Sequence, residues 1–149
     1  MTAEPDEHLV ALLRSASRIL FFTGAGISTG SGIPDFRGPR GVWKRRSPVY
    51  YRDFLALEEK RIEYWEGKVD EFDDLREAQP NETHRAIATL ERLGKVAVVI
   101  TQNIDGLHQA AGTSPGILLE LHGTNHRVEC VECGTPGEPA PAVASFRQS

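Results

Sequence analysis

Three apolar stretches of the sequence predict β-strands. The first two are residues 19–22 and 96–100, which are continuous apolar runs, and the second consists mostly of β-branched side chains. Such runs are typical of strands that are covered on both faces of a sheet. A third strand is expected over residues 117–121.

Helical patterns precede the first two strands. Leucine and valine side chains recur at helical spacing within residues 6–17, which predicts an amphipathic helix. A second helix is expected after Asn81, which can cap it, and Gly94 is a suitable stop. A helix followed by a buried strand thus occurs twice, and this repeat predicts an α/β fold with a doubly wound, parallel, Rossmann-like sheet.

The stretch between these two units, residues 50–75, predicts two short helices with an apolar and aromatic stripe. Gly67 weakens the middle of this run. An aromatic stripe of this kind belongs to a core more often than to a ligand cage. An acidic patch near its end is predicted to face solvent, and it consists of Asp70, Glu71, Asp73, Asp74 and Glu77.

A glycine-rich turn follows the first strand directly. Gly24 and Gly26 carry no Cβ, so the backbone can turn sharply there and come close to a bound group. Residues 27–31 can open a short helix whose N-terminal N–H groups would face a pyrophosphate. The spacing differs from the dehydrogenase fingerprint, because Gly30 comes one residue late and residues 40–46 are basic where an acidic ribose clamp is expected. The turn nevertheless predicts a nucleotide-binding unit.

Polar residues follow the other two strands as well. Residues 101–105 come directly after the second strand, at the end where parallel sheets bind ligands, although the asparagine and aspartate among them could equally form a turn. His122 follows the third strand, and a histidine there can be a general base or a hydrogen-bonded neutral side chain. His84 and His108 are better explained as structural residues.

Charge and hydropathy exclude two classes of partner. The chain of 149 residues carries a formal net charge of −4, which argues against direct nucleic-acid binding. No apolar run is long enough to cross a bilayer, so no membrane partner is expected. These features predict a soluble, cytoplasmic protein.

The two cysteines, Cys130 and Cys133, are separated by two residues. They are too close together to staple a fold, and their spacing suits either half of a four-ligand zinc site or a redox dithiol. Zinc is the favoured hypothesis, because no thioredoxin-like context surrounds the pair. The tail over residues 135–149 is rich in proline and glycine and is predicted to be unstructured.

These strings, taken in order, closely resemble the sirtuins, the NAD-dependent protein deacylases. GAGISTGSGIPDFRG at residues 24–38 resembles the sirtuin cofactor loop, and TQNID at 101–105 and LHG at 121–123 match later sirtuin motifs. The resemblance extends over residues 9–134. It implies an enzyme that transfers the acyl group of an acyl-lysine protein or peptide to ADP-ribose, using NAD and releasing nicotinamide.

The resemblance also implies roles for individual residues. His122 would be the catalytic base on a ribose hydroxyl, and Cys130 and Cys133 would be zinc ligands. Sirtuins that prefer acidic acyl groups carry a Tyr-x-x-Arg pair, which this sequence lacks in the helical region. Removal of acetyl or of longer apolar acyl groups is therefore expected in preference to removal of succinyl groups. The residues that would bind NAD are Gly24, Ala25, Gly26, Ile27, Ser28, Asp35, Phe36, Arg37, Gln102, Asn103, Ile104 and Asp105.

The resemblance divides the chain into three parts. Residues 1–123 would form a partial NAD-binding Rossmann-like domain with a helical insertion, residues 124–134 the start of a zinc module, and residues 135–149 the tail. Sirtuins continue with a second cysteine pair and further strands, so we expect an N-terminal part of a sirtuin with an incomplete sheet, half a zinc site and uncertain activity alone. Two alternatives are a remnant that binds NAD or ADP-ribose without catalysis and a protein ADP-ribosyltransferase.

Overall fold

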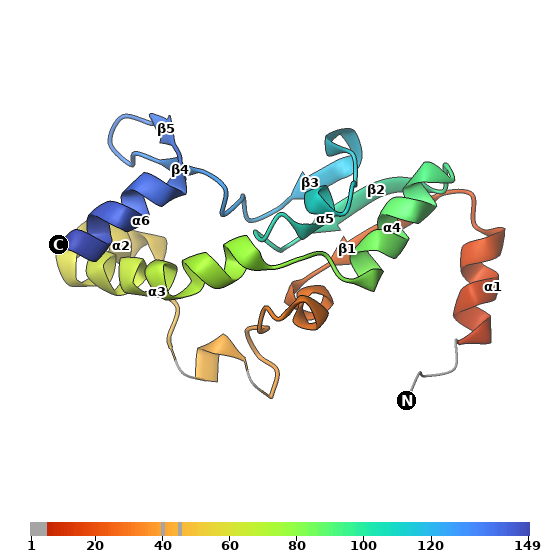
Figure 1. The fold of residues 1–149 in the computed structure, drawn as a ribbon, viewed down its shortest axis with the longest axis horizontal. Coiled ribbons are helices and arrows are strands. Elements are labelled where there is room, and N and C mark those ends of the chain that lie inside the picture. The colour runs from red at the N-terminus through yellow and green to blue at the C-terminus, as the bar shows by residue number, and fades with distance from the viewer. Residues whose placement is uncertain (1–5, 40, 45) are drawn as a thin grey trace.

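A computed structural model describes residues 6–39, 41–44 and 46–149 (Figure 1). Arg40 and Arg45 of the predicted basic stretch lie outside the described residues, as do residues 1–5. A parallel sheet with the strand order β1-β2-β3 forms the centre, and its strands are β1 (Ile19–Thr23), β2 (Val96–Thr101) and β3 (Leu118–Glu120). The three predicted strands and their parallel pairing are therefore confirmed.

The register of the sheet brings the carboxyl ends of its strands together. Thr23 at the end of β1 pairs with Thr101 at the end of β2, and Thr101 pairs with Glu120 at the end of β3. Because parallel strands run in the same direction, the segments that follow them leave from one edge of the sheet. These segments are the glycine-rich turn, residues 102–106 and the stretch that contains His122.

Helices precede β1 and β2 as predicted. They are α1 (Glu7–Ser15) and α4 (Glu82–Arg92), and a short helix, α5 (Leu107–Ala110), follows β2. Asp6 caps α1, and the Nζ of Lys95 donates to three carbonyl oxygens at the other end of α1. Asn81 caps α4 as predicted, and His84 completes a capping box. No helix of the described residues is long and apolar enough to cross a membrane.

The helical insertion consists of α2 (Tyr51–Ala56) and the longer α3 (Glu58–Glu77), and it follows two 3-10 helices over Ala25–Ser31 (η1) and Val42–Lys44 (η2). Phe54 and Tyr64 meet edge to face with ring centroids 5.0 Å apart. The Arg61 guanidinium donates to the carbonyls of Phe54 and Leu55 at the end of α2. These contacts hold the two helices together. Among the described residues of the two helices none is fully buried, and Leu57 and Ile62 of the predicted stripe are exposed, so the expected core role is met only in part.

The prediction of an unstructured tail was wrong. Residues 128–129 (β4) and 136–137 (β5) form a small antiparallel hairpin, and α6 (Pro139–Gln148) follows it. Figure 1 shows α6 lying against the helical insertion. The ring of Phe146 stacks on Trp65 at 6.3 Å, Val143 is buried, and Arg147 pairs with Asp73 at 2.8 Å. Proline at the first helical position favours this helix rather than breaking it.

The sheet has one covered face and one open face among the described residues. Val99 is fully buried, as are Ile87 and Ala88 of α4, which contacts β2. On the opposite face Leu20 and Phe22 are exposed, with 60% of Phe22 accessible to solvent. The structure therefore shows helices on one face and does not show the covering of both faces that the apolar runs predicted.

Two histidines lie side by side beneath this sheet. His84 and His108 are almost fully buried, with ring centroids 5.0 Å apart, and His108 Nε2 is 2.9 Å from the Thr23 hydroxyl. Burial disfavours the charged imidazolium, so it lowers the pKa of His84 and lowers that of His108 to about 4. The neighbouring His84 lowers the pKa of His108 further, whereas Asp105 acts in the opposite direction. The structural role predicted for both residues agrees with this burial.

The buried histidines make stability sensitive to acid. The pKa of His108 is about 4 in the fold and 6.5 in its absence, so between these values the unfolded chain binds more protons. The contribution that neutral His108 makes to the free energy of unfolding is therefore complete above pH 6.5 and is lost as the pH falls toward 4. We expect the melting temperature to fall by several degrees between pH 7 and pH 5.

A calorimetric series of matched variants checks this expectation. His108→Asn should flatten the pH dependence, since asparagine does not titrate, whereas His8→Asn at an exposed position should leave the slope unchanged. An equal slope in the native chain and in His108→Asn would contradict the assignment.

Candidate functional site

Three segments meet at the carboxyl edge of the sheet and form a concave surface. The Gln102 N–H donates to the Thr23 carbonyl at 3.0 Å, and the Leu121 N–H donates to the Thr101 carbonyl at 2.9 Å. These bonds continue the ladder past the last paired residues and hold the three segments next to one another. His122 follows immediately, so its position is set by the end of β3.

Two adjoining cavities of about 660 Å³ and 570 Å³ lie over this edge. They share Ala25, Phe36, Gln102, Asn103 and His122 in their walls, so together they form one continuous hollow. Every residue predicted to bind NAD lines one of the two cavities, and His122 lines both. The structure thus brings together residues that are almost 100 positions apart in the sequence.

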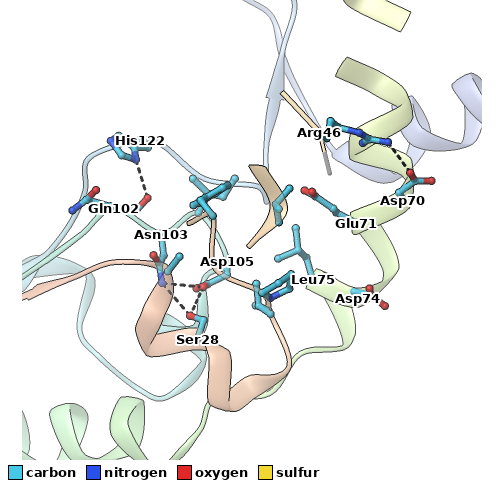
Figure 2. Close-up of a pocket in the computed structure, with 16 residues that line it drawn as sticks. Ser28, Arg46, Asp70, Glu71, Asp74, Leu75, Gln102, Asn103, Asp105 and His122 are labelled. Carbon is cyan, nitrogen blue, oxygen red and sulfur yellow. Dashed lines mark hydrogen bonds and ion pairs between the residues drawn. The ribbon is translucent and has the colours of Figure 1, made fainter. Parts of the chain in front are cut away.

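A buried hydrogen-bonded triad forms the floor of the smaller cavity (Figure 2). The Ser28 hydroxyl donates to Asp105 Oδ2 at 2.6 Å, and Asn103 Nδ2 lies 3.0 Å from the Ser28 Oγ and 3.2 Å from Asp105 Oδ2. The other carboxylate oxygen of Asp105 accepts from the Leu107 N–H at 2.9 Å. Asp105 is only 8% exposed, and this set of donors compensates for the loss of water around its carboxylate.

The sequence left open whether Asp105 forms a turn or faces a ligand site. Asp105 does form a turn, because its carboxylate binds the backbone N–H two residues later. The same carboxylate also joins the segment after β2 to the glycine-rich turn through Ser28. Turn formation and a position in the cavity wall are therefore combined in one side chain.

His122 is exposed at the mouth of the hollow. Its Nδ1 lies 3.0 Å from the Gln102 carbonyl oxygen. A carbonyl can only accept, so Nδ1 carries the hydrogen and Nε2 of the neutral ring is left as the proton acceptor. The side chain can therefore act as a base from a fixed orientation.

The segment after His122 is fastened to the segment after β2. The Asn125 N–H donates to the Ile104 carbonyl at 2.9 Å, and His126 Nε2 lies 3.2 Å from the Asp105 carbonyl. Gly106 has a φ of +73°, and a Cβ at this position would collide with the His126 ring, so this close approach requires glycine. Lys68 of α3 donates to the Asn125 side chain at 2.8 Å, and burial lowers the pKa of Lys68.

Aromatic and charged side chains of the loop after η1 form part of the wall of the larger cavity. Phe36 and Trp43 have ring centroids 5.4 Å apart, and the Arg37 guanidinium lies 4.4 Å above the Trp43 ring. Asp35 Oδ1 accepts from the Gly38 N–H at 2.8 Å, which folds the loop back on itself. The predicted loop residues thus lie together beside the glycine-rich turn.

The acidic patch predicted to face solvent does so only in part. Asp70, Glu71 and Asp74 of α3 line the smaller cavity opposite His122, and Leu75 lies beside them (Figure 2). Asp74 lies four residues after Asp70 and three after Glu71, and this spacing along a helix puts both on the same side as Asp74. This is the sequence signal that could have identified them. Further residues of this wall that the sequence analysis did not assign are Ile33, Pro34, Val42 and Arg46.

A model described as the Sir2 family matches this chain over residues 24–146. The match includes all residues that line the two cavities except Phe22 and Thr23, and it also includes the cysteine pair and most of α6. The chain belongs to the Sir2 family. The resemblance to the sirtuin family that the sequence motifs indicated is thereby confirmed.

Sir2 relatives from bacteria and archaea match at nearly half of the aligned positions. An NAD-dependent protein deacetylase 1 of Bradyrhizobium diazoefficiens is 47% identical over 128 residues, which are 86% of this chain and 50% of that protein. An NAD-dependent protein deacetylase of Saccharolobus solfataricus is 48% identical over 127 residues, which are 85% of this chain and 50% of that protein. The chain spans about half the length of these curated relatives.

Solved Sir2 structures have the same fold. A structure described as Sir2 with a p53 peptide and NAD⁺ superposes with a TM-score of 0.83 at 33% identity, covering 97% of this chain and 57% of that one. Another, described as a structural basis for the mechanism and regulation of Sir2 enzymes, gives a TM-score of 0.79 at 38% identity and covers 95% of this chain and 55% of that one. The α/β architecture is therefore that of Sir2 proteins.

The cysteine pair lies in the β4–β5 hairpin, and both thiols are exposed. The Gly134 N–H donates to the Cys130 carbonyl at 2.8 Å, so the chain turns tightly around the pair. A hydrogen bond with the Thr135 hydroxyl lowers the pKa of Cys133. Within the part of the chain that the structure describes, no group of three or more histidine, cysteine or acidic residues is arranged to hold a metal.

The triad should contribute to stability as well as to the cavity. In Asp105→Ala the Ser28 hydroxyl, the Asn103 amide and the Leu107 N–H lose their shared acceptor inside the protein. We expect the free energy of unfolding to fall by about 3 kcal/mol, because each buried donor without a partner costs about 1–3 kcal/mol. Urea denaturation measures this difference, and Asp74→Ala at an exposed position of the same cavity should change it by less than about 0.5 kcal/mol.

Proposed function

We propose that the protein carrying this chain is an NAD-dependent protein-lysine deacetylase. The observation that carries the proposal is the continuous hollow whose walls contain His122 and every residue of the expected NAD set. The printed names of the relatives, which are NAD-dependent protein deacetylases, support the same activity. So does the Sir2 structure described with a peptide and NAD⁺.

The two cavities suggest how NAD would be divided between them. The glycine-rich turn, Asp35 and Arg37 line the larger cavity, which suits the phosphate and ribose groups. Ser28, Asn103 and Asp105 line the smaller one, where amide and carboxylate groups suit nicotinamide. Phe36 and His122 belong to both walls, so the bond between nicotinamide and ribose would lie between these two side chains.

The chemistry assigned to this chain is proton transfer and orientation. The acyl oxygen of the substrate displaces nicotinamide from the ribose carbon of NAD, and a ribose hydroxyl then attacks the acyl carbon. His122 Nε2 takes the proton of that hydroxyl, while the Gln102 carbonyl holds the opposite side of the ring. A water molecule adds to the acyl carbon as the lysine amine leaves, so the acyl group ends on ADP-ribose and free lysine is released.

Two alternatives predict different products from one mixture. The intact protein is incubated with NAD and an acetyl-lysine peptide, and the mass of the peptide product is measured by mass spectrometry. Loss of the acetyl group supports the deacetylase, whereas a gain of ADP-ribose supports the ADP-ribosyltransferase. An unchanged peptide together with calorimetric binding of ADP-ribose supports a binding protein without catalysis.

Removal of the proposed base should separate binding from chemistry. In His122→Ala we expect the deacetylation rate to fall by about 10²–10⁴-fold, which is the usual contribution of a general base. The affinity for ADP-ribose should change little, because no proton is transferred on binding. His8→Ala at an exposed position is the matched control. A deacetylation rate equal to that of the native protein would exclude His122 as the base.

The acidic wall of α3 supports a preference for uncharged acyl groups. Asp70, Glu71 and Asp74 line the same cavity as His122, and Arg46 is engaged by Asp70 at 3.0 Å. A carboxylate at the end of an acyl chain would meet like charge there, in addition to lacking the Tyr-x-x-Arg partner. The deacetylase is therefore proposed to act on acetyl-lysine in preference to succinyl-lysine.

Neutralising this wall should relax the preference. We expect kcat/KM to be higher on acetyl-lysine than on succinyl-lysine peptides, and Glu71→Gln to raise the succinyl value by about fivefold through removal of one repulsive charge. Glu77→Gln at the exposed end of α3 should leave both values unchanged. A native enzyme that prefers the succinyl peptide would overturn this expectation.

We also propose that Cys130 and Cys133 supply two of the four ligands of a structural zinc ion. The tight turn and the lowered pKa of Cys133 fit such a role, since zinc binds thiolates. Residues 124–134 would then begin a zinc module. This module, the doubly wound arrangement of the sheet and the cytoplasmic location stay predictions.

A further inference from the structure

Asn81 joins helix α4 to the glycine-rich turn with one side chain. Its Oδ1 accepts from the N–H groups of Thr83 and His84 at 3.0 and 3.4 Å, and thereby caps α4. Its Nδ2 donates to the Ile27 carbonyl at 2.7 Å and lies 3.1 Å from the Ser31 Oγ. Both ends of the amide are therefore engaged, one by the helix and the other by η1.

The capping role does not by itself require asparagine. Aspartate and serine cap helices as well, because a cap needs only an oxygen that accepts. The bond to the Ile27 carbonyl needs a donor, because a carbonyl oxygen only accepts, and the aspartate carboxylate has none. The amide is therefore the group that combines both functions at position 81.

Gly30 makes room for this contact. A Cβ at position 30 would lie 3.3 Å from Asn81 Nδ2, which is tighter than ordinary van der Waals contact. This glycine is the one that comes a residue late for the dehydrogenase fingerprint. At this position a glycine leaves room for the close approach of the Asn81 side chain.

The contact reaches the binding cavities through η1. Ile27 lines the larger cavity, and the next residue, Ser28, is part of the buried triad of the smaller one. Helix α4 is anchored in the core by Ile87 and Ala88. Asn81 thus connects a rigid helix to the turn that forms the shared wall.

We propose that Asn81 is a positioning residue that fixes the glycine-rich turn for dinucleotide binding. The proposal rests on the NAD-binding function proposed above for these cavities. It assigns to the Asn81 amide the donor bonds that keep η1 in its binding conformation before the ligand arrives. Loss of these donors, with the helix cap retained, should weaken binding more than it weakens the fold.

Two substitutions that retain a cap test this. In Asn81→Ser and Asn81→Asp we expect backbone amides of residues 27–33 to exchange with deuterium about tenfold faster in the ligand-free protein, because two donor bonds to η1 are lost. Calorimetry should show ADP-ribose binding about tenfold more weakly. In turnover assays the KM for NAD should rise while kcat at saturating NAD stays close to the native value.

The control is a helix cap far from the cavities. Asp6→Ala removes the cap of α1 and should lower the melting temperature without changing ADP-ribose affinity. The proposal would be overturned if backbone amides of residues 27–33 exchanged with deuterium at the native rate in the Asn81 variants. It would also be overturned if Asn81→Ser and Asn81→Asp both bound ADP-ribose with native affinity. If the native protein fails to bind ADP-ribose, the proposed function fails, and the exchange measurement still decides whether Asn81 holds the turn.

Discussion

The buried carboxylate of Asp105 is the feature on which the rest of the site depends. It accepts from Ser28, Asn103 and Leu107, which belong to η1, the segment after β2 and the start of α5. A charge with so little access to water is tolerated only when donors surround it, so these segments must meet at one point for the fold to be stable. The same hydrogen bonds to Asp105 therefore stabilise the fold and shape the cavity floor.

The sheet supplies the frame for this meeting point. Its strands end in register, and their last residues are Thr23, Thr101 and Glu120. Helix α4 then fixes the frame from the covered side through Asn81 and through the buried pair of His84 and His108. Polar side chains at the edge of the core thus hold the glycine-rich turn in place, whereas the apolar residues of the core mainly hold the sheet to its helix.

The opposite wall of the hollow comes from the helical insertion. Helix α3 presents Asp70, Glu71 and Asp74 to the smaller cavity, and α6 packs on the same helix through Phe146 and Arg147. The wall from α3 is therefore acidic, the floor is the hydrogen-bonded triad, and the mouth carries His122. The smaller cavity is therefore lined by more acidic side chains than the larger one, which has Asp35 and Arg37 in its wall.

The sequence by itself determined the strands, most of the helices, the family and the candidate residues of the hollow. Each of these depends on local patterns, such as the apolar run at 96–100, the cap at Asn81 and the glycine-rich motif at 24–38. Only the tertiary structure decided three other features, which are helix α6, the open face that bears Phe22 and the inward position of Glu71. Proline at position 139 is ambiguous until Trp65 offers a surface for Phe146. In the same way, a charged helical face can point to solvent or to a cavity, and the packing of α3 against its neighbours selects between them because burial is a property of the whole fold.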